Sequence, residues 1–171
     1  MMRTTVSDAG ATTEASGLAE LYLRFAPSAL RFAFFLTGDR EVARDLVQDA
    51  FVRVLGRFHD VRNRDAFWGY LRRTIVNLSN SYFRRRRVER TWLERQRPDP
   101  AAPPGPDVAE RERVRAALMT LGPKPRAAVL LRYFEDLSEA ETAELLGIPV
   151  GTVKSTVSRG LDRLREELHD A

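Results

Sequence analysis

Residues 137–168 of the chain are LSEAETAELLGIPVGTVKSTVSRGLDRLREEL. Ser138 lies three residues before Glu141, which is the spacing of a capping box at the start of a short helix. Gly147 and Pro149 then predict a tight turn, since proline has no N–H with which to continue a helix. A second helix with valines on its inward face follows the turn. This order of elements predicts a helix-turn-helix, a motif whose second helix enters the major groove of DNA.

The second helix of this motif is basic, although the segment that contains it is acidic. Between Lys154 and Arg165 there are four basic side chains and one acidic one, whereas residues 98–171 contain 10 basic and 13 acidic side chains. Side chains near the start of such a helix contact base edges, and arginines further along hold phosphates. The simpler alternative is a helical hairpin that packs on a protein partner. The candidate duplex-binding residues are Thr152, Lys154, Ser155, Ser158, Arg159 and Arg163.

The rest of the chain also has the pattern of helices. Apolar residues recur at spacings of three and four over residues 18–36, 39–58 and 66–87, which predicts three helices in one compact bundle. Five of the nine prolines fall within residues 98–106, where they favour an extended spacer. We therefore predict an all-α chain of two small helical domains joined by a proline-rich linker. The expected boundaries are a disordered tail over 1–17, an N-terminal domain over 18–90, the linker over 91–110 and a C-terminal helix-turn-helix domain over 111–171.

Composition excludes several classes of protein. The 171 residues include no cysteine and only two histidines, His59 and His169, so we expect no disulfide, no metal site and no cofactor. No run approaches the roughly 18–20 apolar residues that a membrane-spanning helix needs, so we expect no membrane insertion. The chain has no phosphate-binding loop and no nucleophile with a matching histidine, so we expect no enzymatic activity.

The net charge of +4 is unevenly distributed along the chain. Residues 1–61 carry a net charge of −1, residues 62–97 carry +8 and residues 98–171 carry −3. The basic block coincides with the third predicted helix, where aromatic rings stand beside arginines and amides. Rings can stack on unpaired bases, amides can bond base edges and guanidinium groups can hold the backbone, whereas a solvated basic surface is the simpler alternative. The candidate residues on this helix are Trp68, Arg72, Arg73, Asn77, Asn80, Ser81 and Arg84.

The second predicted helix carries an acidic stripe opposite its apolar face. An acidic surface repels DNA, so we expect this stripe to face a protein, although most such stripes are only the solvated side of an amphipathic helix. The residues of the stripe are Asp45, Gln48, Asp49 and Val52.

Three segments of the chain together resemble the extracytoplasmic-function group of bacterial sigma factors, in particular its short actinobacterial-type subgroup. They are the DLVQDAF sequence at residues 45–51, the helix over 68–87, and residues 137–168 with the GTVKS sequence at 151–155. The segments occur in the family's order, with the proline-rich linker in the family's place. The resemblance implies a protein that binds RNA polymerase core and directs promoter-specific transcription initiation in the bacterial cytoplasm, at the nucleoid.

The resemblance also implies a division of labour among the segments. The acidic stripe would dock on the clamp coiled coil of the polymerase β′ subunit. The aromatic and arginine-rich helix, together with Asn63 in the loop before it, would melt the minus-ten promoter element and hold its non-template single strand. The helix-turn-helix would bind the minus-thirty-five element as duplex DNA and pack on the β flap. An anti-sigma factor is a further partner that the resemblance admits.

A second class of function stays open on the sequence alone. A free-standing helix-turn-helix repressor or activator would use the same C-terminal motif on an operator and would use the first domain to dimerise. Such a regulator needs an exposed apolar dimer face and has no use for residues that bind single strands. Binding to duplex DNA without polymerase core distinguishes the two classes.

Overall fold

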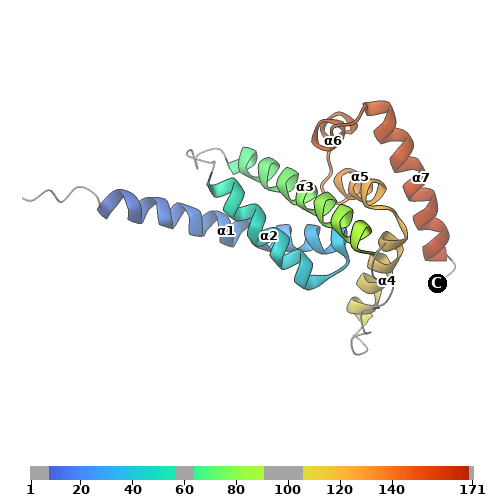
Figure 1. Ribbon diagram of the computed structural model, residues 1–171, viewed down its shortest axis with the longest axis horizontal. Helices are drawn as coiled ribbons and strands as arrows, with labels where there is room; N and C mark the ends of the chain where they lie inside the picture. The colour runs from blue at the N-terminus through green and yellow to red at the C-terminus, as the bar shows by residue number, and fades with distance from the viewer. Residues whose placement is uncertain (1–7, 57–63, 91–105, 170–171) are drawn as a thin grey trace, which may run out of the picture.

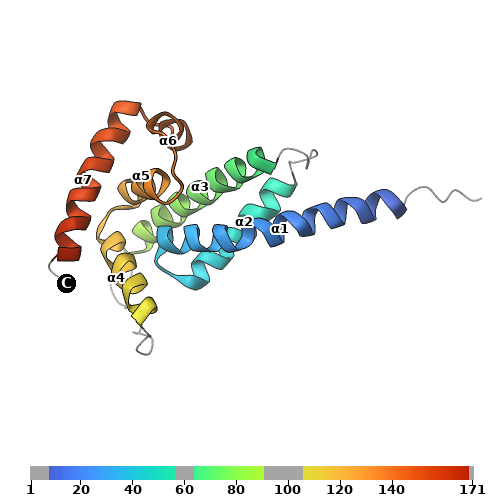
Figure 2. The ribbon, with the colours of Figure 1, turned by 180° about the vertical axis from the view of Figure 1, so that it is seen from behind.

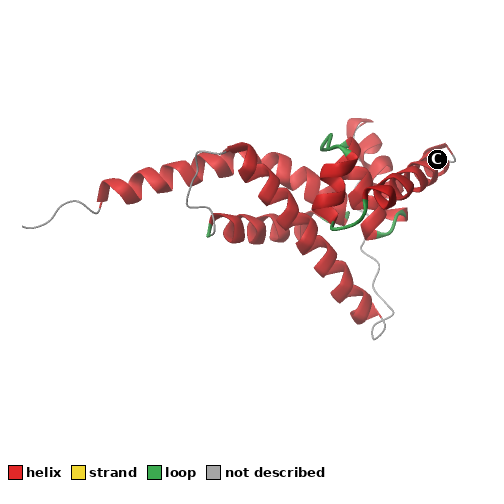
Figure 3. Cartoon of the chain, turned by 90° about the horizontal axis from the view of Figure 1, so that it is seen from above, coloured by secondary structure: helices red, strands yellow, loops and turns green. Residues whose placement is uncertain are grey.

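The computed structural model describes residues 8–56, 64–90 and 106–169, and every regular element within those ranges is a helix (Figure 1). Figure 3 shows the described residues between helices as short loops. None of the described helices combines the length and the apolar character that crossing a bilayer requires. The all-α prediction is confirmed. The helices are α1 (Asp8–Thr37), α2 (Arg40–Leu55), α3 (Arg64–Arg90), α4 (Pro106–Thr120), α5 (Pro123–Tyr133), α6 (Glu139–Leu146) and α7 (Val150–His169).

The described helices differ from the predicted boundaries at two places. α1 begins at Asp8, so residues 8–17, which the sequence assigned to a disordered tail, are helical and extend α1 beyond the bundle (Figure 1). This segment has no apolar face, and its three alanines favour helix although its two glycines oppose it. α4 begins at Pro106 rather than after residue 110, because proline fits the first turn of a helix, where no N–H is needed.

The turn between α1 and α2 is fixed by two residues. Gly38 has a φ of 74°, which suits glycine, and a Cβ at this position would lie 2.5 Å from Met119 Sδ of α4. Asp39 caps α2, since its carboxylate accepts hydrogen bonds from the backbone N–H groups of Glu41 at 2.8 Å and Val42 at 3.1 Å. The same turn therefore starts α2 and allows α4 to approach the end of α1.

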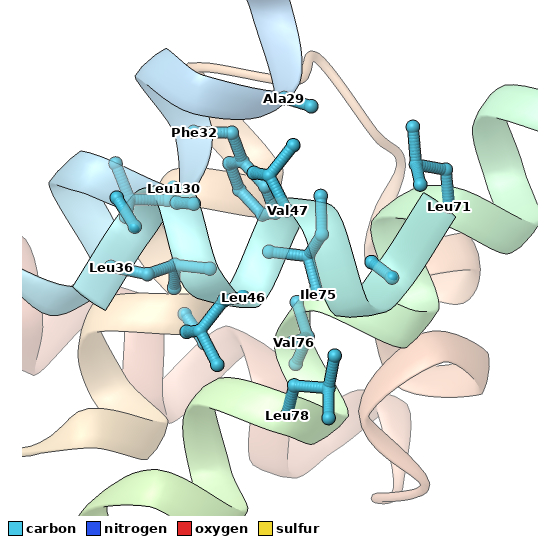
Figure 4. Close-up of a cluster of buried hydrophobic side chains, with 14 of the residues drawn as sticks. Ala29, Phe32, Leu36, Leu46, Val47, Leu71, Ile75, Val76, Leu78 and Leu130 are labelled. Carbon is cyan, nitrogen blue, oxygen red and sulfur yellow. The ribbon is translucent and has the colours of Figure 1, made fainter. Parts of the chain in front are cut away.

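Helices α1, α2 and α3 form the predicted bundle, and its core continues into the C-terminal half. Phe32 of α1, Val47 of α2 and Ile75 of α3 are buried together. Figure 4 shows Leu130 of α5 beside these side chains, in the same cluster. The two domains are therefore packed on one another through a shared apolar core, an arrangement that the sequence did not predict.

Buried polar contacts join the two halves at the ends of α1, α4 and α5. The Arg126 guanidinium of α5 donates hydrogen bonds to the carbonyls of Leu36, Leu118 (2.9 Å) and Leu121 (2.8 Å), and it lies 5.2 Å from the centre of the Phe83 ring of α3. Burial lowers the pKa of Arg126 to about 10, which is still far above neutrality, so the group remains charged. This one side chain contacts both domains.

The C-terminal half has a small core of its own. Ala128, Ala143, Val153 and Val157 pack together from α5, α6 and α7. Gly160 of α7 is buried, and a Cβ there would lie 2.8 Å from Val129 Cγ2. The close approach of α7 to α5 therefore depends on a residue without a side chain.

Thr142 of α6 offers a test of this packing. It is fully buried, and its hydroxyl oxygen has no hydrogen-bond partner within the described residues. We expect Thr142→Val to raise the free energy of unfolding by about 1 kcal/mol, because valine keeps the shape and removes an unpaired buried hydroxyl. Urea denaturation measures the change. The control Thr142→Ala also deletes the methyl group and should lower the stability, whereas a loss of stability in the valine variant would contradict the packing described.

Candidate nucleic-acid interface

The helix-turn-helix has the local geometry that its sequence predicts. The Ser138 hydroxyl accepts a hydrogen bond from the Glu141 N–H, and the Ser138 N–H donates to the Glu141 carboxylate at 2.8 Å. The Ser138 hydroxyl also donates to the Glu141 carboxylate at 2.6 Å, and this bond together with the one from the Ser138 N–H lowers the pKa of the Glu141 carboxyl, since both stabilise its charged form. Gly147 ends α6 with a φ of 65°, and Pro149 then leads into α7. The capping box and the turn are confirmed.

The predicted duplex-binding residues lie on the outer side of α7. Val153 and Val157 hold the opposite side of the helix against α5 and α6. Figure 2 shows α7 at the edge of the molecule, away from α1 and α2. This helix therefore presents hydroxyl, ammonium and guanidinium groups to solvent, which can donate to base edges and phosphates. The exposed residues are Thr152, Lys154, Ser155, Ser158, Arg159 and Arg163.

Neighbouring groups orient the arginines of α7. Arg159 Nε donates a hydrogen bond to the carbonyl of Ser155 at 3.1 Å, one turn earlier on the helix. Arg163 lies 3.9 Å from the Glu167 carboxylate, a loose and exposed pair. Exposed pairs of this kind contribute little stability, so the guanidinium groups can exchange these partners for phosphate oxygens at small cost.

Part of the predicted single-strand face of α3 is open to solvent. Arg73, Asn77, Asn80 and Arg84 recur at spacings of four, three and four residues, so they share one side of the helix. Asn77 and Arg84 are exposed, and Asn80 is half-buried. Ser81, also half-buried, accepts a hydrogen bond from Arg84 at 3.4 Å. The remaining loop candidate, Asn63, lies outside the described residues.

Two of the predicted α3 residues do not project into solvent as expected. The Trp68 ring stacks on Phe25 of α1 at 5.6 Å, and its Nε1–H donates to Glu135 Oε2 at 3.0 Å. Arg72 donates to the same oxygen at 3.0 Å, and only 13% of its side chain and 8% of that of Glu135 are exposed. Strand binding requires Arg72 to face outward from α3, and in this arrangement it does not, because the segment that follows α5 covers it.

A second contact joins α3 to α6. Arg73 Nη2 lies 3.2 Å from the Glu144 carboxylate and 3.2 Å from its backbone carbonyl oxygen. A pocket of about 240 Å³ lies beside this contact, lined by Gly69 and Tyr70 of α3 and by Leu145 of α6 among others. Sequence reasoning did not find Glu135 or Glu144, since contacts between residues more than 60 positions apart leave no local spacing pattern.

The acidic stripe of α2 is exposed along its length. Leu46, Val47, Ala50, Phe51 and Val54 are buried on one side of the helix. The opposite side carries carboxylates and one exposed apolar side chain, Val52, of which 67% is accessible. This combination fits a basic protein surface with an apolar centre. The exposed residues of the stripe are Asp45, Gln48, Asp49 and Val52.

A larger groove of about 530 Å³ lies between α1, α2 and α4. Its lining combines apolar side chains with a surplus of basic ones, so it suits an acidic partner with an apolar face. The apolar lining residues are Leu30, Phe34, Phe35, Ala43 and Phe134, and the charged ones are Arg31, Arg40, Arg44, Arg111 and Glu112.

Comparison with known proteins identifies both halves of the chain. Residues 21–89 match the family described as Sigma-70 region 2, and residues 111–164 match Sigma-70, region 4. The RNA polymerase sigma-E factor of Streptomyces avermitilis is 42% identical over 154 residues, which cover 87% of this chain and 84% of that protein. The ECF RNA polymerase sigma factor SigE of Mycolicibacterium smegmatis is 36% identical over 159 residues, which cover 87% of this chain and 60% of that protein.

Solved structures share the fold. The sigma factor RpoE of Bartonella quintana, in complex with the anti-sigma factor NepR, has a TM-score of 0.64 and 26% identity, covering 88% of this chain and 96% of that one. CnrH in complex with the cytosolic domain of CnrY has the same TM-score with 24% identity, covering 94% and 95%.

The two family matches occur in the order that the sequence motifs predicted. Region 2 covers α2 and α3 and most of α1, and region 4 covers α5 and α6 and most of α4 and α7. A free-standing repressor or activator is the less favoured alternative, since the chain matches sigma factors along both domains. The chain therefore belongs to the extracytoplasmic-function sigma factors of actinobacterial type, which bind RNA polymerase core and direct transcription initiation at specific promoters.

Proposed function

We propose that the outer face of α7 binds the minus-thirty-five element as duplex DNA. The observation that carries this proposal is the two-sided character of α7, whose valines are buried while Thr152, Lys154 and Ser155 are exposed near its start. Residues at this end of a recognition helix face base edges. Arg159 and Arg163 lie further along and supply phosphate contacts, which fix the orientation of the helix on the duplex.

We propose that the solvent side of α3 holds the non-template strand of the minus-ten element. Asn77 and Arg84 support this role, since an exposed amide can bond the edge of an unpaired base and an exposed guanidinium can hold the backbone. The α3 helix stands in the most basic part of the chain, with a net charge of +8 over residues 62–97. A basic face attracts the strand and then holds it apart from its complement.

We propose that the acidic stripe of α2 docks on the clamp coiled coil of the β′ subunit and that the C-terminal domain packs on the β flap. Asp45 and Asp49 lie one turn apart, with the exposed Val52 beside them. Placing these carboxylates on polymerase keeps them away from the DNA phosphates. This division leaves α3 and α7 for nucleic acid.

We propose an anti-sigma factor as a further partner, seated in the groove between α1, α2 and α4. The RpoE structure from Bartonella quintana supports a partner of this class. The groove has walls from both domains, with Phe34 on one side and Arg111 on the other. An acidic helix with an apolar face matches this lining, and it would hold the two domains together.

We propose that the chain catalyses no chemical step of its own and acts in the bacterial cytoplasm, at the nucleoid. The polar groups of the candidate DNA-binding residues on α3 and α7 are amides, hydroxyls, an ammonium group, guanidinium groups and the Trp68 indole, which suit binding rather than proton transfer. RNA polymerase carries out the catalytic step, and the promoter determines where on the DNA it begins.

Transcription in vitro tests the function as a whole. Purified core enzyme, the full-length chain and a pool of genomic promoter fragments should give promoter-specific transcripts, and leaving out either protein should abolish them. Footprinting with the chain alone is the matched control, and we expect no protection of duplex DNA. A promoter-sized footprint without core would instead establish the repressor or activator.

Removing the exposed amides of α3 tests the strand contact. We expect Asn77→Ala with Asn80→Ala to reduce open-complex formation at least tenfold, because a bidentate amide contact to a base is worth roughly 1–3 kcal/mol and the double variant removes both amides. Permanganate reactivity of unpaired thymines measures the opening. Binding to core should stay unchanged, and a loss of core binding would show that this side of α3 is a protein interface.

Reversing a charge on α2 tests the polymerase contact. Asp49→Arg should weaken association with core at least tenfold, since it puts a cation opposite a basic surface. Competition with a labelled sigma factor for core measures this affinity. Glu110→Arg, the same reversal at an exposed position of α4, is the matched control and should bind core normally. Equal losses of affinity for core in both variants would contradict the proposal that the α2 stripe contacts polymerase.

A further inference from the structure

Two hydrogen-bond donors on the proposed strand-binding side of α3 are occupied by a side chain of the C-terminal domain. Trp68 Nε1 and Arg72 Nη1 both donate to one oxygen of Glu135, each at 3.0 Å. The Arg72 guanidinium also lies 5.9 Å from the centre of the Trp68 ring. The Trp68 N–H and the Arg72 guanidinium, two donors of the proposed strand-binding face, are therefore both engaged by a carboxylate from the other domain, while the Trp68 ring itself stacks on Phe25.

We propose that the Glu135 carboxylate takes the place of a DNA phosphate on α3. In the free protein this contact covers the strand-binding side of α3 for as long as the two domains are packed together, which we call the closed arrangement. This inference rests on the proposed role of α3 in holding single-stranded DNA. A carboxylate and a phosphate diester both present anionic oxygens to an arginine, so Glu135 satisfies the donors that the strand would otherwise satisfy. Strand binding and the closed arrangement then exclude one another.

The burial of the contact gives it an energetic effect. The side chains of Arg72 and Glu135 are 13% and 8% exposed, so both charges have lost most of their water. Removing one member of such a pair leaves the other buried without a counter-charge, which strongly disfavours the state that buries it. The loss of Glu135 should therefore destabilise the closed arrangement and leave the separated domains unaffected.

The contact is also incomplete, which allows it to open. Arg72 Nε is buried and finds no acceptor within the described residues, so only part of the guanidinium is satisfied. A phosphate can accept from two edges of the same group. The strand therefore offers Arg72 a better set of partners than Glu135 does, once the polymerase has separated the domains.

The pair formed by Arg73 and Glu144 provides a matched control. It crosses the same interface 3.2 Å apart, but its side chains are 43% and 78% exposed. Water screens an exposed pair, so its loss should change the closed arrangement little. Comparing the loss of Glu135 with the loss of Glu144 therefore distinguishes the effect of a buried carboxylate from that of any charge at the interface between the domains.

The test measures binding of a fluorescent single-stranded minus-ten oligonucleotide to the full-length chain without polymerase. We expect Glu135→Ala to tighten binding about tenfold, with Glu135→Gln intermediate and Glu144→Ala within twofold of the original protein. Adding Arg72→Ala to Glu135→Ala should abolish the gain. The glutamine variant keeps the shape of the side chain, so it carries the test if the alanine variant does not fold.

Domain separation is measured in the same variants. The chain has no cysteine, so Arg53→Cys and Glu166→Cys, at exposed positions of α2 and α7, accept a pair of dyes for energy transfer. We expect the transfer to fall in Glu135→Ala and to stay unchanged in Glu144→Ala.

Each contrary result has a definite meaning. Unchanged strand affinity in both Glu135 variants overturns the inference, and so does a gain that survives Arg72→Ala. The proposed role of α3 is judged separately, by promoter opening with the Asn77 and Asn80 variant in the presence of core. Normal promoter opening by the Asn77 and Asn80 variant would contradict the proposed role of α3. Defective promoter opening by that variant, together with unchanged strand affinity in the Glu135 variants, would contradict only the inference about Glu135.

Discussion

The guanidinium of Arg126 on α5 meets the ends of α1 and α4 where the two domains are packed together. The carbonyls of Leu36, Leu118 and Leu121 lie at or just beyond helix ends and accept hydrogen bonds from Arg126, and Leu118 also accepts one from the Leu121 N–H at 3.2 Å. Such carbonyls cannot be buried without a donor, so the junction of the domains depends on this side chain. The shared apolar core can close around it because the polar groups at its centre are paired.

Helix α3 lies at this junction and has three different surroundings, whereas a single amphipathic pattern describes only one buried side. One side carries Phe67, Leu71 and Ile75 into the core of the bundle, and a second side carries Arg72 to the C-terminal domain. The third side, with Asn77, remains in solvent. The apolar spacing identifies the first of these sides, whereas arginines and amides have the same composition whether they meet a protein, a strand or water.

Local signals therefore predicted most of the fold and only part of the site. The capping box at Ser138 and the turn at Gly147 depend on residues close in sequence, and both occur as expected. The partners of Arg126 are backbone carbonyls, which any residue provides, and Glu135 meets Arg72 only after the domains have packed. The helix over residues 8–17 lacks an apolar pattern, so its alanines were the only indication of it.

The shared core also links the arrangement of the domains to temperature. Leu130 of α5 is packed among side chains of the N-terminal bundle, so separating the domains exposes apolar surface to water. Exposure of apolar surface increases the heat capacity, and the free energy of closing then follows a curve rather than a straight line with temperature. Because apolar association weakens on cooling, the closed form loses part of its advantage in the cold. The hydration of a few buried side chains therefore makes the separation of the two domains of this sigma factor depend on temperature.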